Sequence, residues 1–280
     1  MKNTNAIKQF LTKVIMPPAK SFKDLLGSIK DGKFTKEGGK LLNYEMIPFS
    51  CRALKLTSLI GSPKFINGDF ICSYNNLVSL DGSPQIVSGK FGCENNKLVS
   101  LQGSAHQVNG SFRCSNNELV TLQDGPSIVG GDFYCSNNKL ESLLGAPSKV
   151  NLFNCWNNKL TTLEGSPITV TDSFYCNSNN LTSLIGSPTT VGNDFYCRTN
   201  NLESLKSIHL YIQEINGVAD FMNNPIKERV LGLLKIKGLK TVLLDNKQVE
   251  QIVNRYLPEG DVLNCINELK AAGFTEYALW

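Results

Sequence analysis

Residues 70–84 read FICSYNNLVSLDGSP, and residues 174–188 read FYCNSNNLTSLIGSP. Both belong to one repeating pattern, V/I-x3-F-x-C-x2-N-x-L-x-S/T-L-x-G-x-P-x2, which is present in seven full copies and one degenerate first copy. The repeat length is 21 residues, except that Cys135 and Cys155 are 20 apart because Val150 and Phe153 are three apart instead of four. Repetition at a fixed period of this length predicts a solenoid.

The phenylalanine and cysteine columns of the repeat, two residues apart, point to one side of an extended strand. Stacked at one strand per turn, about 4.8 Å apart, they form two apolar ladders, and each fully buried phenylalanine is worth roughly 1.5–3 kcal/mol. The asparagine is expected in a buried column, where its amide satisfies backbone groups at the strand end. The predicted structural ladder contains Phe70, Cys72, Asn75, Phe91, Cys93, Asn96, Phe112, Cys114, Asn117, Phe133, Cys135 and Asn138.

The end of the repeat carries turn chemistry, such as Gly82-Ser83-Pro84 and Gly186-Ser187-Pro188. A 21-residue unit is too short for a strand, a full helix and two turns. We therefore predict a parallel-sheet β-solenoid whose convex side is mostly non-helical.

The segment Val87-x3-Phe91-x-Cys93-x2-Asn96-x-Leu98 resembles the leucine-rich-repeat core L-x-x-L-x-L-x-x-N-x-L. The resemblance covers residues 49–205, and it departs from the family by phenylalanine and cysteine in two leucine columns and by one extra residue. The repeat is similar to the short repeats of bacterial type III effectors and to repeat proteins of large tailed phages and giant viruses. The resemblance implies a curved solenoid that binds partners on its concave face.

The evenly spaced cysteines contain no C-x2-C pair, and uniform spacing is not the spacing of metal ligands. Free cysteine packs as a small hydrophobic residue, so we expect buried, reduced thiols, with no metal and no cofactor. Reduced thiols favour a cytoplasmic protein, in the host cytoplasm if the gene belongs to a phage. No apolar run is long enough for a transmembrane helix, so we expect no membrane partner.

The chain divides into three expected domains: residues 1–48, 49–205 and 206–280. Residues 1–48 carry nine Lys and four Asp or Glu, and short helices over 5–15 and 21–29 are expected to form a basic N-terminal cap. Residues 206–280 lose the repeat and are expected to form a small helical domain.

Within residues 206–280, capping signals predict helices over 225–236, 246–256 and 261–272. A short β-prone run lies between them, at 241–244.

An enzymatic function is not predicted. The chain has only two histidines, His106 and His209, and it contains no P-loop, nucleophile elbow or zinc-protease motif. Cys265 is the only cysteine outside the ladder, but it lacks the C-x-D motif of bacterial leucine-rich-repeat ubiquitin ligases and lies on a predicted amphipathic helix.

The residues that follow each phenylalanine and each cysteine are expected to face outward. In the second half of the repeats they include four aromatic side chains, with arginines nearby: Tyr134, Trp156, Tyr175, Tyr196, Arg113 and Arg198. Tyr, Trp and Arg are enriched at binding hot spots, so these six residues are the predicted partner-binding site. The alternative is that the aromatic rings only stack across strands or lie beneath a cap.

We therefore predict a non-enzymatic protein-interaction module that occludes or scaffolds a partner, as a phage or bacterial effector or inhibitor would. A second hypothesis is nucleic-acid binding by the basic N-terminal segment and the aromatic stripe. A third is a structural component of a particle. The net charge of +4 is too small to decide between these hypotheses.

Overall fold

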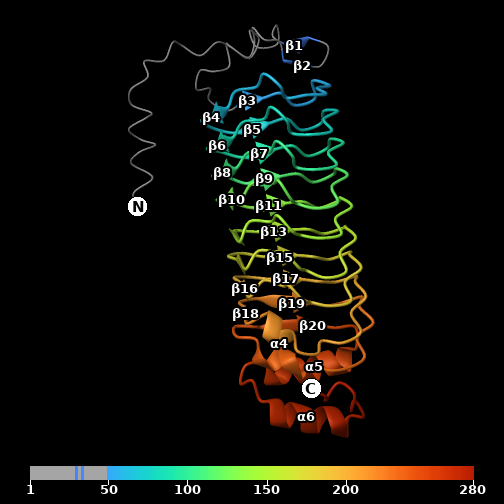
Figure 1. Cartoon of the computed structure of the whole chain (residues 1–280). Helices are drawn as coiled ribbons and strands as arrows, with labels where there is room; N and C mark the ends of the chain where they lie inside the picture. Colours follow the sequence, from blue (N-terminus) through green and yellow to red (C-terminus); the bar gives the residue numbers. More distant parts are fainter. Residues whose placement is uncertain (1–28, 31–32, 35–48) are drawn as a thin grey trace, which may run out of the picture.

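The computed structural model describes residues 29–30, 33–34 and 49–280. In residues 49–205 each repeat forms one turn of a coil, and the turns stack along one axis (Figure 1). The predicted class, a parallel-sheet β-solenoid with few helices, is confirmed. The expected helices over 5–15 and 21–29 fall on residues outside the described part, except for Ile29 at the edge of β1. Strands β1 (Ile29–Lys30) and β2 (Lys33–Phe34) pair antiparallel.

The largest sheet is formed by the eight strands that begin at the ladder phenylalanines and by two further strands that follow them. Neighbouring strands of this sheet pair in register, so that each phenylalanine lies beside the next, as Phe91 lies beside Phe112. The sheet has ten parallel strands: β3 (Phe49–Ser50), β5 (Phe70–Ile71), β7 (Phe91–Gly92), β9 (Phe112–Arg113), β11 (Phe133–Tyr134), β13 (Phe153–Asn154), β15 (Phe174–Tyr175), β17 (Phe195–Tyr196), β19 (Val218–Asp220) and β20 (Thr241–Leu243).

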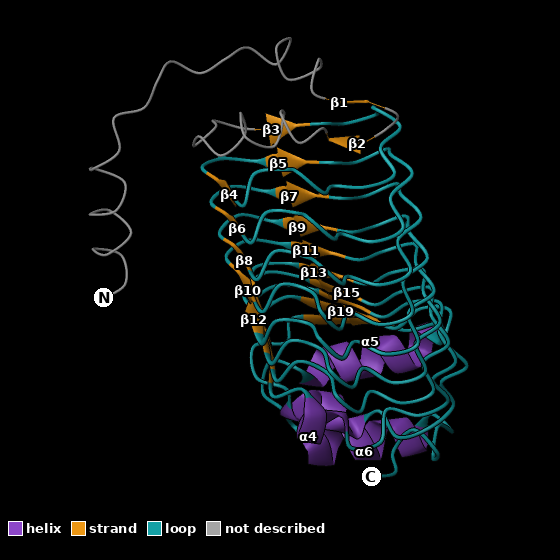
Figure 2. Ribbon diagram, turned by 45° about the horizontal axis from the view of Figure 1, so that its top comes forward, coloured by secondary structure: helices purple, strands orange, loops and turns teal. Residues whose placement is uncertain are grey.

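A second strand in each turn ends at the valine or isoleucine of the repeat. These strands form two separate four-stranded parallel sheets, visible along one side of the stack in Figure 2. The first sheet contains β4 (Phe65–Ile66), β6 (Ile86–Val87), β8 (Gln107–Val108) and β10 (Ile128–Val129). The second contains β12 (Lys149–Val150), β14 (Thr169–Val170), β16 (Thr190–Val191) and β18 (Glu214–Ile215).

The turns follow one another along the whole length of the molecule (Figure 1). Both sides of each turn are extended strands, and these pair with the strands of the neighbouring turns except between β10 and β12. Strand pairing sets a rise of about 4.8 Å per turn. The curvature expected for the outer face of the large sheet stays a prediction.

The core of the column is the space between the sheets. The rings of neighbouring repeats, from Phe49 to Phe195, lie with centroids 5.2 to 5.7 Å apart. Cys51 and the seven cysteines after it in the ladder are all fully buried. The two leucine columns and the valine column close the remaining walls.

The buried asparagines connect each turn to the one before it. The Asn117 amide nitrogen Nδ2 donates to the carbonyl oxygens of Cys93 at 3.1 Å and Cys114 at 3.0 Å. The Leu98 N–H donates to Asn117 Oδ1 at 3.0 Å. The residue before it, Asn116, has a φ of 56°, a left-handed conformation that asparagine tolerates better than most residues. The column thus ends every strand in the same sharp turn.

The solenoid extends beyond residue 205, where the repeat pattern in the sequence stops. Strands β19 and β20 continue the ten-stranded sheet. Asn224 continues the asparagine column, because its Nδ2 donates to the carbonyls of Cys197 and Phe221, each at 3.0 Å. Residues 206–280 are therefore not a purely helical unit, since they include further turns of the column.

The helix predicted over 225–236 is wrong. The segment contains only the 3-10 helix η1 (Leu231–Lys235). The Asn224 side chain bonds to the carbonyls of the asparagine column and does not cap a helix. The Lys227 N–H donates to the Glu203 carbonyl of the previous turn at 3.0 Å. Pairing with the stack therefore overrides the local helical signal.

Two predicted helices at the C-terminal end are confirmed. They are α5 (Lys247–Tyr256) and α6 (Val262–Ala271), and the short helix α4 (Ile208–Tyr211) lies before them. Asn246 caps α5 by accepting from the Val249 N–H, and Asp261 caps α6 by accepting from the Asn264 N–H. The β-prone run at 241–244 forms β20. Within the described residues, the helices are too short or too polar to cross a bilayer.

Candidate functional site: an aromatic face on the ten-stranded sheet

The candidate site is the outer surface of strands β9 to β17 and the residues just after them. We call it the aromatic face and define it as Arg113, Tyr134, Trp156, Tyr175, Tyr196 and Arg198. Alternation along each strand buries phenylalanine and cysteine and turns the residues between and after them outward. The three tyrosines are half-buried, and Trp156 is 37% exposed.

Two of the tyrosines form a stacked pair. Tyr175 and Tyr196 are direct neighbours on β15 and β17, and their ring centroids are 4.8 Å apart with an interplanar angle of 12°. The Tyr196 hydroxyl donates to Asp194 Oδ2 at 3.0 Å. Burial, together with this carboxylate, raises the pKa of Tyr196 to about 12. The hydroxyl therefore stays neutral and fixed at neutral pH.

A second cluster surrounds Tyr134. The Arg113 guanidinium carbon lies 4.8 Å from the centre of the Tyr134 ring, in a cation–π arrangement. The Tyr134 hydroxyl donates to Asp132 Oδ2 at 3.2 Å. Burial, and then the Asp132 charge, raise the pKa of Tyr134. The Tyr134 ring is thus held at its hydroxyl by a carboxylate and on one face by a cation.

The aromatic residues do not form one continuous stripe. Between Tyr134 and Tyr175 the equivalent strand position is Asn154, whose Oδ1 accepts from the backbone N–H of Trp156 at 3.2 Å. Trp156 comes from the column after the cysteine, two residues beyond Asn154. The face is therefore a tyrosine with its arginine, a tryptophan offset to one side, and a stacked tyrosine pair.

Sequence reasoning missed the carboxylates of this face: Asp132 and Asp194, which accept from the tyrosine hydroxyls, and the buried Asp220. Asp220, on β19, is the direct neighbour of Tyr196, and its Oδ2 lies 3.6 Å from Arg198 Nε. It was missed because the repeat has already lost its phenylalanine and cysteine at this turn. Its signal is the spacing of Asn224, which stands four residues after Asp220 as Asn200 stands after Tyr196.

The first half of the sheet has small and polar side chains on the same surface. Gly92 and Ser73 are buried, and Ser73 Oγ and Glu94 Oε2 have no hydrogen-bond partner. A side chain at Gly92 would lie 2.9 Å from Glu94 Oε2, so the glycine makes room for that carboxylate. This half offers no exposed aromatic ring between Arg113 and Tyr74.

The thiols are poorly placed for nucleophilic chemistry. Burial raises the pKa of Cys51 to about 12, and burial with the nearby carboxylates of Glu268 and Asp261 raises that of Cys265 to about 11. A thiol is reactive as its thiolate, so both are inert at neutral pH. Among the described residues, no group of His, Cys, Asp and Glu side chains is arranged to hold a metal ion.

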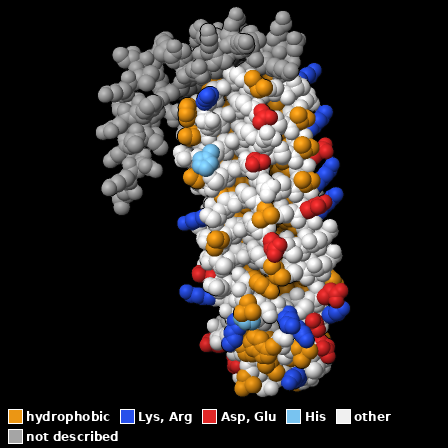
Figure 3. All heavy atoms as spheres, in the orientation of Figure 1, with side chains coloured by type: hydrophobic (Ala, Val, Ile, Leu, Met, Phe, Trp, Pro, Cys, Tyr) orange, Lys and Arg blue, Asp and Glu red, His pale blue; other side chains and the backbone are white. Residues whose placement is uncertain are grey.

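Exposed apolar side chains also occur at the C-terminal end. On the face seen in Figure 3 they are scattered over the repeats and gather near that end. Leu210, Leu263 and Trp280 are more than half exposed. Exposed apolar area therefore does not single out the aromatic face. What distinguishes the aromatic face is the combination of fixed rings with arginine and aspartate side chains on one paired sheet.

Comparison with known proteins gives one informative result. No family model and no curated protein matches the chain. Among solved structures it is similar to the functional domain of InlJ from Listeria monocytogenes, which is described as including a cysteine ladder. The two are 18% identical, the TM-score is 0.41, and the match covers 75% of this chain but only 50% of that one.

Proposed function

We propose that this protein is a non-enzymatic interaction module that binds a partner protein through the aromatic face. The carrying observation is the set of rings already fixed in place on a paired sheet: Tyr175 on Tyr196, and Arg113 over Tyr134. Fixed aromatic side chains lose little conformational entropy on binding. Rings flanked by charged groups are typical of interaction hot spots.

The proposed mode of action is occlusion or scaffolding of the partner by a rigid surface. The resemblance of the repeat to those of phage, giant-virus and effector proteins supports an effector or inhibitor of a host protein. The fully buried cysteines support action in a reducing compartment, the cytoplasm of a microbe or of its infected host.

Nucleic-acid binding is less well supported by the face. Stacked tyrosines and arginines suit unpaired bases, but the partly exposed Asp132 and Asp194 lie among them. These carboxylates repel phosphates, so the surface favours a protein partner with mixed charge.

The test compares proteins captured from the native cell by three forms of this chain. The first is the wild type, and the second replaces Tyr134, Trp156, Tyr175 and Tyr196 with alanine. The matched control replaces the exposed valines Val78, Val99 and Val120 with serine, because they lie outside the ten-stranded sheet.

We expect one partner to be captured by the wild type and the control and lost at least tenfold with the aromatic-face variant. Calorimetry with the purified partner then gives the affinities. Equal capture by all three forms, with an unchanged thermal transition, would exclude the aromatic face as the binding site.

A further inference from the structure

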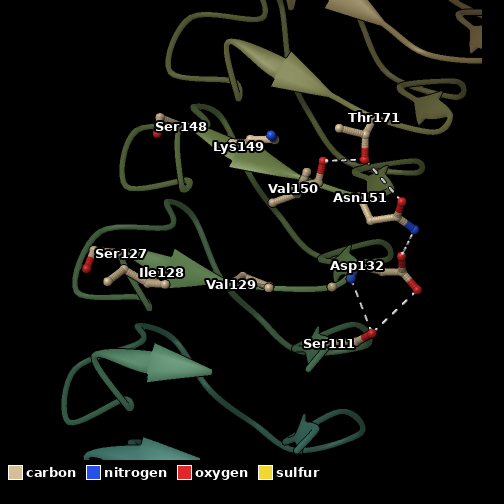
Figure 4. Close-up of a pocket in the computed structure, with 12 residues that line it drawn as sticks. Ser111, Ser127, Ile128, Val129, Asp132, Ser148, Lys149, Val150, Asn151 and Thr171 are labelled. Carbon is tan, nitrogen blue, oxygen red and sulfur yellow. Dashed lines mark hydrogen bonds between the residues drawn. The ribbon is translucent and has the colours of Figure 1, made fainter. Parts of the chain in front are cut away.

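A hollow of about 690 Å³ lies on the side of the column between the two four-stranded sheets (Figure 4). It coincides with the short turn, in which two residues instead of three separate Val150 from Phe153. Its walls come from four consecutive turns, and it adjoins the aromatic face at Asp132, which lines the hollow and also accepts from the Tyr134 hydroxyl. Volumes of roughly 300–1,000 Å³ are typical of small-molecule sites.

The missing residue opens the hollow by breaking the sheet. In the turn before it, the Gly130 N–H donates to the Val108 carbonyl at 2.9 Å. In the short turn the equivalent N–H, that of Asn151, donates instead to the Gly131 carbonyl at 3.0 Å. Strands β10 and β12 consequently have no bridge, although every other neighbouring pair in this series does. Their facing backbone groups border the hollow without a neighbouring strand.

The wall carries both hydrogen-bond donors and acceptors. Asn151 Nδ2 donates to Asp132 Oδ1 at 2.7 Å, and Thr171 Oγ1 donates to Asn151 Oδ1 at 3.1 Å. Figure 4 shows this chain of contacts along one side of the hollow. Further hydroxyls come from Ser111, Ser127 and Ser148. Ser111 is bonded to Asp132 and Ser127 to His106, so the groups are fixed by their neighbours. The second Nδ2 hydrogen of Asn151 and the Ser148 hydroxyl are left for a ligand.

The hollow is close to neutral and partly apolar. Among its lining residues, Lys149 is the cation and Asp132 the anion. The exposed apolar side chain of the hollow is that of Ile128, while Val129 and Val150 line its base but point into the core. This balance disfavours a strongly charged ligand, and the polar wall disfavours a purely apolar one because its groups would lose water without replacement.

A peptide strand does not fit between the two sheets. The turns on either side of the hollow stay bonded through Phe133 and Phe153 in the large sheet and through Asn151 and Gly131 at the corner. A ring that carries several hydroxyl groups meets all the remaining conditions, since its hydroxyls both donate and accept and its C–H face packs on aliphatic side chains. We propose that the hollow binds a neutral saccharide of one or two rings.

The test restores the missing residue. A glycine inserted between Val150 and Asn151 gives the turn the length of its neighbours, so that β10 and β12 can pair and close the hollow. Lactose, maltose, cellobiose and chitobiose are each added to the full chain, and binding is measured by saturation-transfer NMR. We expect at least one disaccharide to bind the wild type and none to bind the insertion variant.

A second variant covers the case in which the insertion disturbs folding. Asn151→Leu removes the amide at the centre of the wall and should weaken binding at least tenfold. Asn109→Leu is the matched control, because Asn109 has the same place in a turn of normal length, and it should bind as the wild type does.

Three results would overturn the proposal. The first is that none of the four disaccharides binds the wild type. The second is that binding survives both the insertion and Asn151→Leu, which would place the sugar elsewhere. The third is that trialanine binds the hollow while the sugars do not, which would make it a peptide site.

Discussion

At the scale of single residues, the column depends on the buried asparagine side chains, which no apolar residue can replace. The asparagine side chain supplies two donors and an acceptor to backbone groups that lie too deep for water. A leucine or valine of the same volume would leave those backbone groups unsatisfied, at about 1–3 kcal/mol each. The phenylalanines and cysteines around it contribute by burial alone.

We expect Asn117→Ala to lower the free energy of unfolding by about 3 kcal/mol or more, because several buried backbone groups lose their partners together. Chemical denaturation measures the change. Asn180→Ala is the control, since Asn180 is exposed and should change stability by less than about 0.5 kcal/mol. Equal effects of the two substitutions would contradict the assigned role of the column.

The buried thiols make stability depend on pH in the alkaline range. Burial raises the pKa of Cys51 to about 12 in the folded protein, whereas the unfolded thiol titrates near 8.5. The stabilisation is therefore complete below about pH 8.5 and is lost as the pH rises toward 12. We expect the denaturation midpoint to be flat from pH 7 to 8 and to fall steeply above pH 9.

Alkylation provides an independent check of the thiols. Iodoacetamide at pH 8 should leave the ladder cysteines of the native protein unmodified and should modify all nine cysteines after denaturation. Mass spectrometry counts the added groups. Substantial labelling of the native ladder at pH 8 would mean that these thiols are accessible, contrary to their complete burial.

At the scale of elements, each tight turn rests directly on the backbone of the turn before it. Gly103 has a φ of 81°, and a side chain there would lie 2.5 Å from the Asp81 backbone nitrogen. Gly273 has a similar φ of 86° but has no atom within 4 Å of that position. An alanine at either position adopts an unfavourable φ, but only at Gly103 does its methyl group also collide with a neighbouring turn. Comparing the two substitutions therefore separates the free-energy cost of the collision from that of the strained φ.

We expect Gly103→Ala to destabilise the protein by at least about 2 kcal/mol more than Gly273→Ala, because the added methyl group forces neighbouring backbones apart. Thermal and denaturant unfolding of the two variants measure the difference. Similar losses would show that the strained φ accounts for the whole effect and that the turns are not in close contact.

The elements differ in how well the sequence predicts them. The phenylalanine strand follows from spacing alone, because the pattern repeats from Phe49 to Phe195 with only one single-residue deletion. The second strand, at the valine, was not foreseen, since only one of its two residues belongs to the pattern. The region around Asn224 was misread because a local capping signal and a ladder position use the same residue, and only the contact with Cys197 distinguishes them.

At the scale of the whole molecule, the aromatic residues were predicted to face outward but their grouping was not. Spacing places Tyr175 beside Tyr196, but it does not indicate that Arg113 turns toward Tyr134 or that Asp220 meets Arg198. Those contacts depend on side-chain rotamers and on a turn beyond the repeats. The hollow is visible in the sequence as a missing residue, but its effect on sheet pairing requires the three-dimensional register.

Ionic strength separates the two classes of partner. If the aromatic face binds a protein of mixed charge, the affinity should fall less than about tenfold between 50 and 200 mM salt. Binding that neutralises six to ten phosphates would fall by about 10³–10⁵ over the same range. Titration of the captured partner, and of an oligo-dT strand, at both salt concentrations measures the slopes. A steep slope with the oligonucleotide would favour the nucleic-acid hypothesis.

The stacking of one repeat per turn has an evolutionary consequence. In-frame duplication or loss of one repeat in the gene adds or removes one rung, roughly 4.8 Å of length, and the turns on either side can pair in the same register. This architecture can therefore change its reach in small equal steps while each surviving repeat keeps its own surface residues.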